Sequence, residues 1–154
     1  MINIRKGTDR FNFRSVAVII QDNHVLLHRL STDAFWSLPG GRVEFFEFAH
    51  EAVVREVHEE TEIESRSIRP LWHVECFFRL HGKHFHEIAT YFEVEPIQPV
   101  TSFEPFHGEE GDLILVFEWF PLDGLKDLNL KSAFLKEGLL NLPESPQYLC
   151  VKDD

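Results

Sequence analysis

The order of apolar and polar positions along the chain predicts strands on both sides of one amphipathic helix. Residues 15–20 and 25–30 are apolar and rich in branched side chains, and a polar turn separates them, so a hairpin is expected. Between residues 48 and 61 the period changes to three or four, which predicts a helix. Its apolar stripe consists of Ala49, Ala52, Val53 and Val57.

The second half of the chain predicts further strands and two short helices. Residues 68–80 and 85–94 read as strands joined by a turn at 81–83, and residues 113–120 as another strand. Residues 98–112 hold two prolines and two glycines and are expected to form a loop. Short helices are expected at 125–130 and 134–140. This order predicts one mixed α/β (α+β) domain over residues 1–154, with helices covering a sheet.

Composition and charge narrow the class of protein. The 154 residues carry 15 Lys and Arg against 26 Asp and Glu, a net charge of −11, and 44% of them are hydrophobic. Such a chain folds into a core, and its acidity argues against long nucleic acids and anionic membranes as partners. No apolar stretch could span a membrane and no signal peptide is expected. Cys76 and Cys150 fit reduced thiols, so we expect a cytoplasmic protein.

Carboxylates gather on the predicted helix and at its start. Glu56, Glu59 and Glu60 fall three and four positions apart, on one face, where like charges repel each other. An acidic helix is most often only a solvated face. Here it follows the Pro39-Gly40-Gly41 turn, and a hard divalent cation with oxygen ligands would offset the repulsion. A metal site that meets phosphate is therefore an alternative interpretation of this segment, beside a solvated helix face.

The same segment resembles the Nudix box of the MutT-like Nudix hydrolase family. The residues that match its pattern are Gly41, Glu47, Arg55-Glu56, Val57, Glu59-Glu60 and Ile63. Two positions depart from the family. Glu62 stands where the pattern has glycine, and a left-handed conformation there would cost about 1 kcal/mol. Phe48 stands where the family usually caps the helix with Ser or Thr, a loss of roughly 0.5–2 kcal/mol. Neither departure removes a carboxylate of the site.

The resemblance implies a fold, a reaction and a set of site residues. The fold would be a mixed sheet between helices (α/β/α), and the reaction the hydrolysis of a nucleoside diphosphate linked to another group. Glu56, Glu59 and Glu60, with the carbonyl of Gly40, would bind Mg²⁺ or Mn²⁺. Glu47 and Arg55 would orient them. The general base would be a glutamate of the box or of a distant loop. Glu109 and Glu110 are the loop candidates, and Glu110 is the one we expect at the site.

Four further residues are candidates for substrate contact. Arg29 resembles a family position that faces phosphate, although a surface arginine is the commoner role. Phe35 and Trp36 precede the glycine turn and could stack on a base, although core packing is the usual role of a phenylalanine. His86 could reach the substrate. With His81 and His84 it also lies on or beside a predicted hairpin, so a structural zinc site is a competing hypothesis.

The substrate is narrowed only by elimination. The motifs that mark the ADP-ribose, NADH and coenzyme A subfamilies are missing or misplaced here. A general nucleotide hydrolase is left, acting on (d)NTPs or nucleotide sugars, small phosphorylated partners that the acidity does not exclude. The alternative is a non-catalytic nucleotide-sensing module on the same fold. The many phenylalanines and free sheet edges allow a homodimer.

Overall fold

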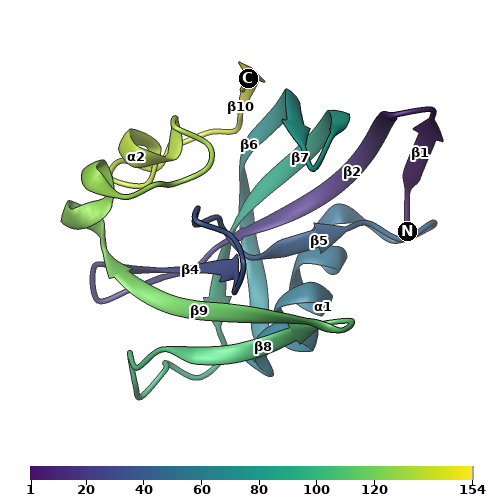
Figure 1. Ribbon diagram of the computed structural model, residues 1–154. Helices are drawn as coiled ribbons and strands as arrows, with labels where there is room; N and C mark the ends of the chain where they lie inside the picture. Colours follow the sequence, from purple (N-terminus) through teal and green to yellow (C-terminus); the bar gives the residue numbers. More distant parts are fainter. Residues whose placement is uncertain (154) are drawn as a thin grey trace.

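The computed structural model describes residues 1–153, and its strands form two sheets (Figure 1). The larger sheet has the order β1-β2-β7-β6-β10, with β5 also paired to β2, and is mixed because the β2–β7 and β6–β10 pairs are parallel. The smaller sheet is antiparallel, in the order β3-β4-β9-β8.

The bounds of these strands follow the chain from end to end. The larger sheet consists of β1 (Asn3–Lys6), β2 (Asp9–Val18), β5 (Gly40–Arg42), β6 (Ser65–Leu80), β7 (Lys83–Pro96) and β10 (Gln147–Lys152). The smaller sheet consists of β3 (Ile20–Gln21), β4 (His24–Leu30), β8 (Phe106–Glu110) and β9 (Leu113–Pro121). The helical segments are α1 (Ala49–Thr61), the 3-10 helix η1 (Leu122–Asp127) and α2 (Leu135–Gly138).

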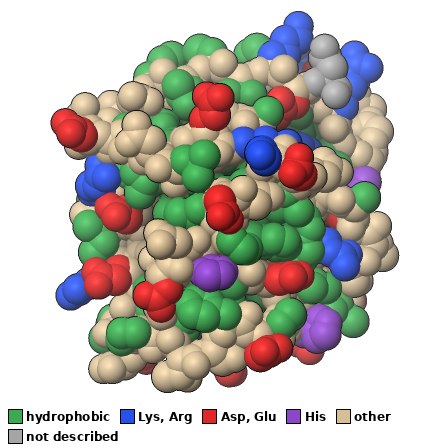
Figure 2. Space-filling view, turned by 90° about the vertical axis from the view of Figure 1, so that its left-hand side faces the viewer, with side chains coloured by type: hydrophobic (Ala, Val, Ile, Leu, Met, Phe, Trp, Pro, Cys, Tyr) green, Lys and Arg blue, Asp and Glu red, His purple; other side chains and the backbone are tan. Residues whose placement is uncertain are grey.

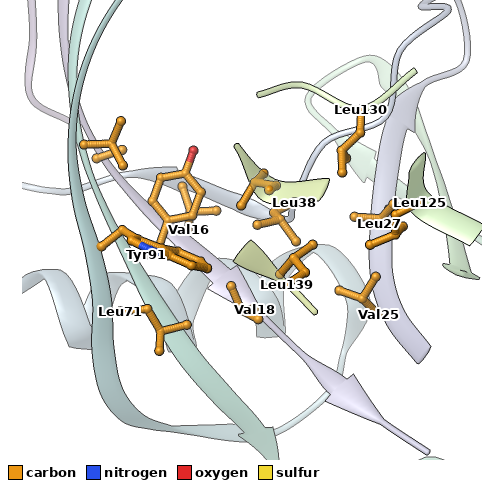
Figure 3. Packing of buried hydrophobic residues seen from close by; sticks show 14 of the residues in the cluster. Val16, Val18, Val25, Leu27, Leu38, Leu71, Tyr91, Leu125, Leu130 and Leu139 are labelled. Carbon is orange, nitrogen blue, oxygen red and sulfur yellow. The ribbon is translucent and has the colours of Figure 1, made fainter. Parts of the chain in front are cut away.

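Apolar side chains on both faces of β2 and β4 create two cores. Ala17 and Ile19 belong to a cluster with Val53 and Val57 of α1. Neighbouring residues of the same strands point the other way, because strand side chains alternate. They belong to a second cluster, shown in Figure 3, which the C-terminal segment closes with Leu125, Leu130, Leu135 and Leu139. Helical segments thus cover both faces of the larger sheet, as Figure 1 shows. The predicted mixed α+β class is confirmed.

The predicted helix is confirmed, and both of its departures from the family pattern have a structural counterpart. Phe48 is the N-cap residue, and its side chain makes no capping hydrogen bond. At the other end, Glu62 adopts the left-handed conformation with φ 62°, and its N–H donates to the carbonyl of His58 at 2.8 Å. The helix therefore ends with Glu62 in the left-handed conformation that glycine usually adopts at this position, and that conformation is strained for glutamate.

Three expectations about the strands were wrong or incomplete. The predicted loop 98–112 contains the edge strand β8, which pairs with β9. Its glycine and polar residues obscure the strand pattern in the sequence. The predicted hairpin of 15–20 with 25–30 is reduced to the pairing of β3 with the start of β4, because β2 ends at Val18 and belongs to the other sheet. The edge strands β1 and β10 were not predicted. None of the helices within residues 1–153 is long and apolar enough to cross a membrane.

Candidate active site

Arg55 connects the start of α1 to the carboxylates that follow it. Its Nε and Nη2 donate to the two carboxylate oxygens of Glu47 at 2.7 and 3.0 Å. Its Nη1 donates to Glu56 at 2.8 Å and to Glu59 at 3.2 Å. The hydrogen bonds to Arg55 hold the pKa of Glu47 below its usual range. In turn, the hydrogen bonds to these carboxylates, above all to Glu47, raise the pKa of Arg55. The guanidinium therefore orients three carboxylates as one charged unit.

Gly41 leaves the space that the Glu56 carboxylate occupies. A Cβ atom at Gly41 would collide with all three atoms of that carboxylate, so only glycine permits this contact between β5 and α1. Burial raises the pKa of Glu56, although the hydrogen bond from Arg55 opposes that effect. The glycine turn thus places one carboxylate at a defined point of the site.

Glu60 is buried without a hydrogen-bonding partner for one of its oxygens. Its side chain is 5% exposed, and Oε2 accepts no hydrogen bond from residues 1–153. Burial, with the charges of Glu56 and Glu110 adding to it, raises the pKa of Glu60 to about 8. The nearest cationic candidate is Nδ1 of His28 at 3.8 Å, but burial lowers the pKa of that imidazole to about 3, so it is neutral. The charge of Arg14 opposes this rise in the pKa of Glu60, but Arg14 forms no ion pair with that carboxylate.

This donor set fits a hard divalent cation, although its ligands are not gathered in advance. Within residues 1–153 no group of three or more His, Cys, Asp or Glu side chains is arranged as a metal cluster. An unsatisfied buried carboxylate oxygen is nevertheless what such a cation would satisfy, and Mg²⁺ needs few carboxylates because water and phosphate complete its shell. Gly40 and Glu56 line the cleft beside Glu60.

A cleft of about 340 Å³ opens beside these residues, between the ends of the two sheets. Of the site residues predicted from the sequence, it brings together Arg29, Phe35, Gly40, Glu56 and Glu110. Arg29, however, already donates to the backbone carbonyls of residues 30, 31 and 33, and its guanidinium carbon lies 5.2 Å from the centre of the Trp36 ring. Trp36 does not line the cleft and packs against Phe120.

The strand β8 places Glu110 at the cleft. Gly108 lets this strand approach α1 closely, since a Cβ there would collide with the carbonyl oxygen of Glu60. Two residues later, Glu110 lines the cleft, and its charge contributes to the raised pKa of Glu56 and of Glu60. Glu109 alternates to the other face of the strand. Of the two predicted loop glutamates, Glu110 is the one beside the carboxylates.

His86 lies elsewhere. Its Nε2 is 2.6 Å from a carboxylate oxygen of Glu75, and its ring packs edge-on against Phe11 and Phe77. His86, Phe11 and Phe77 line a groove. Strand alternation places them on the opposite face of the larger sheet from Asn12 and Glu87 of the cleft. His84 is paired with Asp9 instead, at 3.5 Å. In the described part of the chain, the histidine hairpin supplies no three-ligand set for zinc.

Sequence reasoning missed three cleft residues on the floor formed by β2 and β7. They are Asn12, Arg14 and Glu87, and all three line the cleft. Asn12 and Glu87 are register partners in the parallel β2–β7 pair. The available signal was the alternation of β2, where polar residues at 12 and 14 share a face with Val16 of the core. Glu87 is too far away in sequence for any spacing to connect it with them.

Comparisons with known proteins agree on one family. The family model described as NUDIX domain matches residues 12–139. Among solved structures, a UDP-X diphosphatase has a TM-score of 0.60 and 22% identity over 90% of this chain and 66% of its own, so this chain spans about two thirds of its length. An ADP-ribose pyrophosphatase from Streptococcus suis has a TM-score of 0.62 and 16% identity, over 90% and 98%. A MutT protein from Methanosarcina mazei Go1 has a TM-score of 0.55 and 27% identity, over 80% and 87%. No curated protein matches the chain.

Proposed function

The chain belongs to the NUDIX domain family and is a hydrolase of phosphorus-containing acid anhydrides, and from this premise we propose a divalent-metal-dependent pyrophosphohydrolase. Its substrate would be a nucleoside diphosphate linked to another group. One observation carries the proposal: the buried carboxylate of Glu60 has an unpartnered oxygen close to the Arg55-oriented carboxylates at the edge of the cleft. Such an arrangement destabilises the protein unless the carboxyl is protonated or a cation compensates its charge.

In this proposal, Glu56, Glu59 and Glu60 with the Gly40 carbonyl hold Mg²⁺ or Mn²⁺. The bound ion supplies charge neutralisation at the phosphate oxygens. Arg55 and Glu47 would fix the direction of the carboxylates. Phosphoryl transfer depends mainly on positioning and electrostatics, so this rigid arrangement is the main contribution of α1.

The proton acceptor is proposed to be Glu110. It is the glutamate of β8 that lines the cleft, on the side facing Glu56 and Glu60. A carboxylate there could accept the proton of the attacking water as the anhydride bond breaks. Glutamates of the box itself are the competing candidates.

The two similar structures named as a UDP-X diphosphatase and an ADP-ribose pyrophosphatase support nucleoside diphosphate derivatives as substrates. Nucleoside triphosphates contain the same anhydride and belong in the same test. Both cysteines are free thiols, which favours action in a reducing compartment such as the cytoplasm.

The test is a panel of nucleoside diphosphate sugars and nucleoside triphosphates, with Mg²⁺, with Mn²⁺ and with chelator. We expect turnover that requires metal and that falls at least about 100-fold in Glu60→Gln, because several kcal/mol of charge stabilisation is lost. Glu51→Gln, on an exposed position of the same helix, is the matched control and should keep full activity. Equal activity of Glu60→Gln and wild type would refute the proposal. Saturable nucleotide binding without turnover would favour the sensing module.

A further inference from the structure

The cleft contains several arginines, but most of them are already engaged by the protein. Arg29 donates to three backbone carbonyls. Arg55 does not line the cleft, and it donates to three carboxylates. Arg42 donates to the sulfur of Met1 at 3.1 Å. The exception is Arg14, whose guanidinium makes no hydrogen bond or ion pair with any other residue from 1 to 153. Of the three arginines that line the cleft, Arg14 is thus the one without a hydrogen-bonding partner among residues 1–153.

The strand register explains how Arg14 is accommodated. In the parallel β2–β7 pair it is the register partner of Ala89, which has a small side chain. Glu87 lies two residues before Ala89 on the same face, diagonal to Arg14. Burial opposes the charge of Arg14, but the carboxylates around it, Glu87 foremost, hold its pKa above the ordinary value. The side chain is therefore a permanent cation in the cleft floor.

Glu87 is a second uncommitted group on this floor. The residue is 8% exposed, and it lines both the cleft and a recess of about 130 Å³ that continues from it. Its Oε2 accepts one long hydrogen bond, 3.4 Å from Nδ2 of Asn12, and it forms no ion pair within the described residues. A carboxylate in this position would repel phosphate oxygens. The Glu87 carboxylate can instead accept a hydrogen bond from a neutral donor group of the ligand.

We propose that Arg14 binds a phosphate oxygen of the substrate and that Glu87 accepts hydrogen bonds from hydroxyl groups of a sugar adjoining the diphosphate. This inference rests on the proposed function, which it sharpens to a substrate class, the sugar-bearing nucleoside diphosphates. The hydroxyls can come from the ribose of the nucleoside or from a sugar on the other phosphate. Each of these sugars is joined to its phosphate through a single bridging oxygen.

The expected selectivity follows from the cost of an unpaired acceptor. A ligand that lacks the hydroxyl would desolvate Glu87 without replacing its hydrogen bonds with water. Sites that hydrogen-bond a substrate hydroxyl discriminate strongly against analogues without it. We expect a preference of about 10- to 100-fold for the hydroxyl-bearing ligand.

The experiment measures binding by calorimetry in the Glu60→Gln background, so that its result does not depend on turnover. The ligands are ADP-glucose, its 2′-deoxyribose counterpart and the methyl ester of ADP, with the matching uridine series. ADP-glucose or UDP-glucose should bind about 10- to 100-fold more tightly than at least one of its two counterparts, and the weaker counterpart identifies which sugar Glu87 contacts. Equal affinities across both series, or no binding in either, overturn the inference.

Two further variants separate recognition from a structural role. Glu87→Gln should reduce the preference to a few-fold while leaving the affinity for inorganic pyrophosphate unchanged or higher, because that probe carries no hydroxyl group. Arg14→Gln should weaken pyrophosphate and ADP-glucose alike. Glu95→Gln, on an exposed position of the same strand β7, is the control. If Glu87→Gln weakens pyrophosphate as much as ADP-glucose, Glu87 only supports the fold and the inference fails. Loss of metal-dependent turnover in wild type, in contrast, would refute only the proposed function.

Discussion

At the scale of single residues, the carboxylates of the site differ in how many hydrogen-bonding partners they have. Arg55 serves three carboxylates, whereas Glu60, one turn further along the helix, has an oxygen with none. Since a buried carboxylate without compensation favours its protonated form, Glu60 should leave a signature in the metal-free protein that the exposed glutamates of α1 do not.

That signature is a dependence of stability on pH. The pKa of Glu60 is raised from its ordinary 4.5 to about 8 in the folded protein, so folding favours the protonated carboxyl. The stabilisation that protonated Glu60 gives the folded protein is complete below pH 4.5 and is lost as the pH rises towards 8. Without metal, wild type should therefore lose a few kcal/mol relative to Glu60→Gln over this range. Denaturant unfolding of both proteins at several pH values measures the difference, and parallel pH profiles would contradict the assignment.

Gly41 permits a second prediction at this scale. Gly41→Ala places a Cβ where the Glu56 carboxylate lies, so the carboxylate must move. A displacement of about 1 Å at a catalytic group can cost on the order of 100-fold in rate, and we expect such a loss in kcat/KM. Gly124→Ala is the control, because a Cβ there meets no atom within 4 Å. Equal activity of the two variants would show that the contact is not needed.

At the scale of elements, the end of α1 shows how the chain departs from its family without losing the site. Glu62 holds φ at 62°, a conformation that costs a non-glycine residue about 1 kcal/mol. Glu62→Gly should therefore raise the free energy of unfolding by about 1 kcal/mol and the melting temperature by about 2–4 °C. Glu62→Ala keeps the strain and should give no such gain. Equal melting temperatures of the two variants would show that backbone strain at Glu62 does not reduce the stability.

The elements differ in how far the sequence alone could predict them. The helix was predictable because its apolar stripe and its carboxylates follow one period, and the same local spacing made Glu56, Glu59 and Glu60 a candidate site. The strand β8 was not, since Gly108 and neighbouring polar residues interrupt the alternation. Glu110 was therefore predicted as part of a loop. Arg14 and Glu87 meet only through the pairing of β2 with β7, which no local pattern specifies.

At the scale of the whole molecule, the charge of −11 is divided between surface and site. Figure 2 shows acidic side chains scattered over one face among apolar ones, where they are solvated. The cleft instead brings carboxylates, of which Glu87 is buried, together with Arg14, Arg29 and Arg42. An acidic protein can thus receive a phosphate ligand only if cations offset these carboxylates, and Arg14 together with the proposed metal ion would supply that charge.

The two cores predict how this molecule unfolds. Since β2 and β4 contribute to both clusters, loss of packing on one side should destabilise the other. Leu135 is fully buried in the cluster closed by the C-terminal segment, so Leu135→Ala should cost about 2–5 kcal/mol. Leu140→Ala, at a position that is 58% exposed, should change the free energy of unfolding by less than about 0.5 kcal/mol.

Tryptophan fluorescence can follow both cores at once. Trp72 belongs to the same cluster as Leu135, whereas Trp119 belongs to the cluster under α1. In proteins that each retain one of these reporters, Leu135→Ala should lower both unfolding midpoints by the same amount. A shift confined to the Trp72 reporter would mean that the C-terminal segment unfolds on its own. The cleft floor at Arg14 and Glu87, which lies on strands common to both sides, would then keep its geometry after that segment had been lost.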